Sequence, residues 1–115
     1  MRRGVAVALA VLGVPAALAL AQEPDPSAAG RKVYEDRKCA TCHMVAGEGN
    51  IRFKLDGVGG RLAEDDLRRW LTDADAMERA LPTRPAVRMS EWLDSNRKIS
   101  DADVDALVAY LASLK

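Results

Sequence analysis

The sequence is poor in the residue types that build most catalytic and metal sites. Its 115 residues include one histidine and two cysteines, so a site that needs several of either is excluded. Neither sign of charge predominates, because 17 basic residues are matched by 17 acidic ones. Without a cationic excess, nucleic acid is not expected as a partner. The chain also lacks internal repeats and convincing apolar-polar alternation, so no strand is predicted and the expected fold class is all-α.

Long apolar runs are missing except at the start. Two arginines precede an almost unbroken run of small apolar residues from Val5 to Leu20, and Ala19 and Ala21 are the small residues that a signal peptidase requires. The pattern predicts a signal peptide over residues 1–21. A retained membrane anchor is the alternative, but the run falls short of the ~20 apolar residues of a comfortable span. We therefore expect a periplasmic or otherwise exported protein with no stable membrane insertion.

The remaining chain is predicted to hold one small domain. Residues 22–26 form a polar, proline-containing leader, and residues 27–115 form the domain itself. A domain of this length buries a smaller fraction of its surface than a typical one does. We expect something other than side chains to supplement its core.

Helical segments are predicted from the 3.6-residue period and from capping residues. The first runs from about Ser27 into the Cys39 region, with Asp25 as N-cap and Pro26 at the first helical position. The last follows Ser100, which opens a capping-box pattern. Between them the sequence predicts a glycine-rich loop over 46–61, a helix over 62–75, an irregular segment over 76–90 and a short helical piece capped by Ser90.

One motif accounts for both cysteines and the histidine. Cys39, Cys42 and the adjoining His43 fit the C-x-x-C-H pattern of covalent haem attachment. Two thiols about one helical turn apart can each add to one vinyl group on a single porphyrin edge, and the neighbouring imidazole can then reach the iron. A covalently bound haem would supply the large apolar core that the short chain lacks. The predicted cofactor is one haem c, held through two thioethers.

Three other readings of this motif were weighed. A thioredoxin-like C-x-x-C follows a buried strand, whereas a charged segment precedes Cys39 and no βαβ pattern exists. A structural zinc needs a fourth nitrogen or sulfur ligand, and no further cysteine or histidine is present. A bond between the two cysteines would leave His43 unexplained.

The second axial ligand of the iron is expected to be a methionine, because no second histidine exists and a Met/His pair favours electron transfer. Met44 adjoins His43 and cannot cross to the opposite haem face. Met89 lies in the irregular segment before the final helix, where a loop can reach across the ring. Met89 is therefore preferred, with Met77 and an iron without a sixth protein ligand as alternatives.

With these residues in view, the sequence resembles the class I cytochrome c family from about Gly30 to its end. In that family the first and last helices cross at a glycine-aromatic contact, which implies Gly30 and Tyr34 against Leu107 and Tyr110. The segments that carry the resemblance are Gly30–Tyr34 with Cys39–His43, the post-haem loop Leu55–Arg61 and the C-terminal helix Asp105–Leu111. The resemblance implies a small cytochrome c fold of three to five helices wrapped around one haem.

The sequence departs from the family pattern at two places. Ser90 replaces the proline that usually follows the axial methionine, and Arg52 to Leu55 replaces a Gly-Pro-Asn-Leu segment whose proline carbonyl accepts a bond from the haem-binding imidazole. The backbone carbonyl of Phe53 is expected to take over that bond with His43. By resemblance, Arg61 and Trp70 are candidates for contacts near the haem propionates, although a solvated charge and a core aromatic are equally good readings.

The predicted function is the transfer of single electrons between exported or membrane-bound partners, such as respiratory, oxidase or dehydrogenase complexes. No substrate turnover is expected. An enzyme or gas sensor with five-coordinate iron is the main rival, but it would normally need a distal acid-base group, and His43 is the only histidine.

Overall fold

The computed structural model describes residues 10, 13, 25–96 and 98–115. The predicted signal peptide lies outside the described residues, Ala10 and Gly13 apart, and so does most of the leader. Among the described residues, no helix is both long enough and apolar enough to cross a membrane.

The first and last helices begin at the caps that the sequence predicts. Helix α1 covers Pro26–Asp36, and the Asp25 carboxylate accepts a bond from the Ser27 amide over 3.0 Å. Helix α6 covers Asp101–Ser113, and the Ser100 hydroxyl oxygen accepts a bond from a backbone amide in the first turn over 3.2 Å. Each side chain satisfies an amide that has no partner within its own helix.

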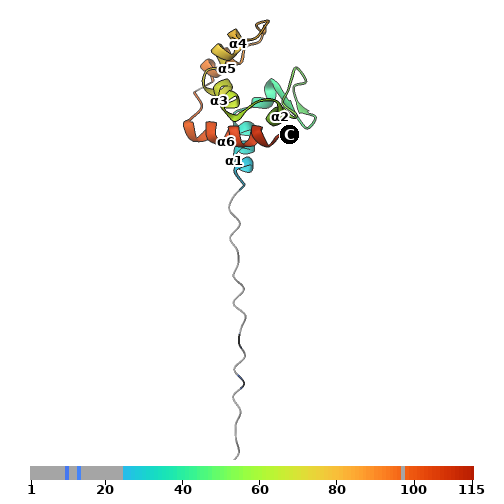
Figure 1. The fold of residues 1–115 in the computed structure, drawn as a ribbon, viewed down its shortest axis with the longest axis vertical. Helices are drawn as coiled ribbons and strands as arrows, with labels where there is room; N and C mark the ends of the chain where they lie inside the picture. The colour runs from blue at the N-terminus through green and yellow to red at the C-terminus, as the bar shows by residue number, and fades with distance from the viewer. Residues whose placement is uncertain (1–9, 11–12, 14–24, 97) are drawn as a thin grey trace, which may run out of the picture.

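Helices α1 and α6 pack against each other, and α3, α4 and α5, which lie within residues 64–95, are above them in the view of Figure 1. A Cβ atom on Gly30 would lie 1.9 Å from the carbonyl oxygen of Ala106, so only a glycine allows this approach. Next to it, the rings of Tyr34 and Tyr110 meet edge to face, with centroids 5.7 Å apart. The expected glycine-aromatic contact between the two helices is confirmed.

The first helix is shorter than predicted. It ends at Asp36 instead of continuing into the cysteine motif, because Lys38 adopts a left-handed conformation with φ of 57°. A 3₁₀ turn over Cys39–Thr41 follows. The break changes the chain direction and separates the cysteine motif from α1.

Six α-helices are present in the described part of the chain, more than the three to five expected. The additional ones are short: α2 is a single turn, and α4 lies in a segment predicted to be irregular. The carboxylate of Asp73 accepts a bond from the Ala76 amide over 3.4 Å and so caps a new helix there. The four helices between α1 and α6 are α2 (Val58–Arg61), α3 (Glu64–Thr72), α4 (Ala74–Arg79) and α5 (Met89–Ser95).

The role predicted for Ser90 as a helix cap is wrong. Helix α5 begins one residue earlier, at Met89, and its N-cap residue Arg88 offers no side-chain bond to the first turn. The hydroxyl and amide of Ser90 instead bond to a side chain of another helix, Glu78.

The end of the cysteine motif and the glycine-rich loop together form a small sheet that the sequence analysis did not predict. Strands β1 (His43–Val45), β2 (Glu48–Gly49) and β3 (Phe53–Lys54) pair in the order β2-β1-β3. Strand β1 runs antiparallel to β2 and parallel to β3. Ala46 and Gly47 have φ of 52° and 81° and reverse the chain between the first two strands. Strands of two or three residues are too short to show alternation, which explains why the prediction missed them.

The buried core lies on the inner face of α6. Val104 and Leu107 are almost fully buried, and Leu67 and Leu71 of α3 join the same cluster. The α2 turn packs against the C-terminal end of α6, where the Gly59 amide donates a hydrogen bond to the Leu114 carbonyl oxygen over 2.8 Å. The arrangement leaves an apolar hollow between the cysteine motif, α3 and α5.

Candidate haem site

The hollow is a cavity of about 390 Å³. This volume falls within the ~300–1,000 Å³ typical of cofactor pockets. Aliphatic and aromatic side chains together make up most of the wall, as is usual for cofactor sites. Six of the seven residues predicted for the site lie on this wall, namely Cys39, Cys42, His43, Phe53, Trp70 and Met89.

The small sheet orients His43. Strand pairing places His43 directly opposite Phe53, and the imidazole Nδ1 lies 3.2 Å from the Phe53 carbonyl oxygen. A carbonyl oxygen can only accept, so this bond places the proton on Nδ1 and leaves the lone pair on Nε2. Burial lowers the pKa of His43, although the bond to Phe53 opposes that shift, and the neutral imidazole is therefore favoured. The contact is the one expected to replace the missing proline carbonyl.

The two cysteines lie at the 3₁₀ turn that leads into β1. Both are partly buried free thiols that line the cavity. Burial raises the pKa of the Cys39 thiol to about 11. Thiol-disulfide chemistry needs a thiolate near neutral pH, and a thiol with so high a pKa does not provide one. This environment is unfavourable for the thioredoxin-like alternative.

The structure separates the two candidate methionines. Met89, at the first position of α5, lines the cavity and packs against the core cluster. Met77, on α4, is absent from the cavity wall. The cavity therefore brings Met89, but not Met77, together with His43.

Trp70 and Arg61 also differ in position. Trp70 lies on α3 and lines the cavity, whereas Arg61 lies on α2 away from the cavity wall. The guanidinium of Arg61 donates to the backbone oxygen of Asp56 over 2.7 Å. The proposed role of Arg61 near the propionates stays a prediction.

Among the polar residues of the cavity wall that were not predicted as site residues, two are buried. The hydroxyl of Tyr34 is buried and has no hydrogen-bond partner among the described residues. Glu78 is 1% exposed and reaches the wall from α4. The position of Tyr34 in the sequence indicated only a contact between helices. Glu78 lies in a segment that was predicted to be irregular, and nothing in the sequence around it indicated that its side chain is buried.

Comparison with known protein families shows to which family the chain belongs. The cytochrome c model matches residues 27–115, which is most of the chain. The chain belongs to the cytochrome c family. Membership implies haem c as the cofactor and haem-based electron transfer as the activity, and the C-x-x-C-H motif agrees with it.

One curated relative gives a more distant comparison. The cytochrome is 29% identical over 107 residues to cytochrome c oxidase subunit 2 of Alkalihalophilus pseudofirmus. The match covers 82% of the cytochrome and 28% of the relative, so the chain spans little more than a quarter of that protein. No solved structure matches the chain.

The residues of the cavity fit a haem c. Two thiols, an imidazole whose Nε2 carries no proton, and a thioether all line the cavity. The remaining wall is largely apolar, as a porphyrin face requires. The hydroxyl of Tyr34, a lining residue, has no hydrogen-bond partner within the described part of the chain, so it is available to a bound group.

Proposed function

We propose that this cytochrome is a single-electron carrier with one haem c, linked to Cys39 and Cys42 and ligated by His43 and Met89. One observation carries the proposal: an apolar cavity brings both sulfur-bearing side chains of the motif, an oriented imidazole and a methionine together. A Met/His ligand pair favours electron transfer over the binding of small molecules at iron.

The haem supplies a one-electron iron couple, and the protein residues control its surroundings. The Phe53 carbonyl fixes the tautomer and direction of His43, so that Nε2 is presented to the metal. Met89 offers a neutral sulfur ligand from the start of α5. Phe53 and Trp70 contribute aromatic surface to the wall that would face a bound porphyrin. No acid-base side chain is needed, because no substrate bond is broken.

The partners proposed are exported or membrane-bound redox proteins, in particular respiratory oxidase or dehydrogenase complexes. Support comes from the predicted signal peptide over residues 1–21 and from the relative named as an oxidase subunit. We propose a periplasmic or otherwise exported location, with no substrate turnover by the cytochrome itself. Redox encounters of this kind use small, transient interfaces.

Haem attachment and redox behaviour test the proposal together. Protein produced with a c-type maturation system should retain haem after denaturation and organic extraction, and its alkaline pyridine spectrum should show two thioether bonds. Cys39→Ala should show one. A potentiometric titration of the wild type should follow a reversible one-electron curve. Extractable haem, or a wild-type spectrum with a free vinyl group, would contradict the assignment.

A further inference from the structure

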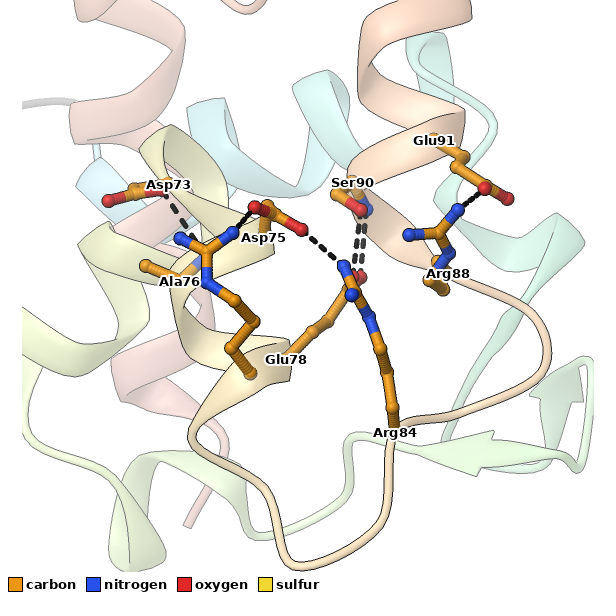
Figure 2. A network of polar contacts seen from close by, with 9 residues as sticks. Asp73, Asp75, Ala76, Glu78, Arg84, Arg88, Ser90 and Glu91 are labelled. Carbon is orange, nitrogen blue, oxygen red and sulfur yellow. Dashed lines mark hydrogen bonds and ion pairs between the residues drawn. The ribbon is translucent and has the colours of Figure 1, made fainter.

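A buried carboxylate joins the two helices on either side of the loop that precedes Met89. Glu78, in the last turn of α4, accepts a bond from the Ser90 amide over 2.9 Å and another from the Ser90 hydroxyl over 2.7 Å. Both residues are buried, Glu78 to 1% and Ser90 to 8% exposure. Figure 2 shows the two side chains facing each other across the space between α4 and α5.

Two arginines surround this contact with positive charge. Arg84, from the loop, lies 3.9 Å from the second carboxylate oxygen of Glu78 and also pairs with Asp75, while Arg88 pairs with Glu91 (Figure 2). Burial alone would raise the pKa of Glu78, but the two bonds from Ser90 and the charges of Arg84 and Arg88 outweigh it and lower that pKa. The carboxylate is therefore ionised at neutral pH and accepts both bonds at full strength.

The Ser90 amide that bonds to Glu78 is next to Met89 in the chain. Ser90 follows Met89 directly in the first turn of α5, where backbone amides have no partner within the helix. The N-cap residue Arg88 provides no side-chain bond, so Glu78 performs the capping role from another helix. The chain between α4 and α5 is irregular and contains two prolines, and it has no strand or helix of its own to fix its end.

From this geometry we propose that Glu78 is the positioning residue that holds Met89 against the haem iron. The inference rests on the proposed function, since it assumes that Met89 is the axial ligand. The bond from its amide fixes the backbone of Ser90, the bond from its hydroxyl fixes its side chain, and the Cα of Met89 is thereby held one residue away. When these bonds are removed, the start of α5 loses its cap and the thioether competes less well with an external ligand.

Imidazole is the probe of this competition, because it binds ferric haem in place of a weakly held methionine. In the oxidised holoprotein, Glu78→Ala should tighten imidazole binding by at least about tenfold, since each bond to a charged group is worth a tenfold factor or more. Glu78→Gln keeps an acceptor for the Ser90 amide and a donor for its hydroxyl, so it should stay within about threefold of wild type. Asp94→Asn removes an exposed carboxylate from α5 and should leave the affinity unchanged.

A double-mutant comparison separates positioning from general loosening. With Met89→Ala as background, Glu78→Ala should change imidazole affinity by less than about twofold, because no thioether is left to position. A tenfold effect that persists in this background would overturn the proposal. Should Glu78→Ala fail to fold, Ser90→Ala decides instead: it removes one bond only and should tighten imidazole binding severalfold.

The outcomes also distinguish this proposal from the ligand assignment beneath it. A wild type that lacks the sulfur-to-iron absorption band contradicts Met89 as ligand and removes the basis for a role of Glu78. A wild type that has the band, together with Glu78→Ala and Ser90→Ala variants of unchanged imidazole affinity, overturns only the positioning role.

Discussion

A single backbone oxygen decides which nitrogen of the histidine is available to a metal. The parallel pairing of β1 and β3 sets Phe53 opposite His43, and the 3.2 Å contact places the proton on Nδ1. Because the acceptor is a main-chain carbonyl oxygen, the bond to His43 does not depend on which side chain position 53 carries. The Phe53 carbonyl can therefore take the role that the family resemblance assigns to a proline carbonyl.

Glu78 makes protein stability depend on pH in a defined direction. Its pKa in the folded protein lies below the ordinary value of 4.5, so the folded state favours the charged form. The stabilisation is fully present above the unfolded pKa and is lost as pH falls through the folded pKa. Guanidinium unfolding of the holoprotein should therefore show wild type exceeding Glu78→Gln by a constant amount near neutral pH and by progressively less below about pH 4.5.

The same pH series carries its own control. Ser90→Ala removes one of the bonds that lower the pKa of Glu78, so in that background the Glu78→Gln difference should be smaller and should shrink less as pH falls. A wild-type advantage that grows as the solution becomes more acidic would mean that the folded protein prefers the protonated form of Glu78.

At the scale of elements, the crossing of α1 and α6 depends on one missing side chain. The Cβ of an alanine at position 30 would approach the Ala106 oxygen to 1.9 Å and the Tyr110 Cβ to 2.5 Å. Backbone atoms cannot rotate away as a flexible side chain can, so the two helices would have to separate. The edge-to-face contact of Tyr34 with Tyr110 would weaken with them.

Gly30→Ala should lower the free energy of unfolding by about 3 kcal/mol, the upper end of the usual cost of overpacking. Gly60→Ala is the matched control, because a Cβ there would meet nothing within 4 Å. Chemical denaturation of both holoproteins is the measurement. The control should change stability by less than about 1 kcal/mol, in either direction. Equal losses in the two variants would contradict the close helix crossing.

Elements set by local chemistry were predictable, and elements set by distant contacts were not. Asp25 and Ser100 cap their helices through bonds to amides within three residues, so their sequence neighbours alone were informative. Strand β3 forms because Phe53 pairs with His43 of β1, and Ser90 bonds to Glu78, which is twelve residues away in the sequence. No local pattern marks either pairing. The extra helix α4 was missed because Asp73 both ends α3 and caps the next helix.

At the scale of the whole molecule, the cavity extends the hydrophobic core that lies on the inner face of α6. Side chains from the cysteine motif, the small sheet and the helices α3, α4, α5 and α6 all reach the same space of about 390 Å³. A domain of this size gains much of its stability from whatever fills such a space. The five residues of the cysteine motif were enough to predict haem c as the cofactor. The other lining residues could be identified only from the folded structure. The same cavity distinguishes Met89 from Met77, which the sequence could rank only by position in the chain.

The central claim is that His43 and Met89 together ligate one haem c, and optical spectra of three oxidised and reduced holoproteins test it most directly. Wild type should show the weak long-wavelength sulfur-to-iron band when oxidised. Met89→Ala should lose that band and bind carbon monoxide when reduced, whereas Met77→Ala, which changes a methionine off the cavity wall, should behave as wild type. A band that survives Met89→Ala, or one that disappears in Met77→Ala, would contradict the account.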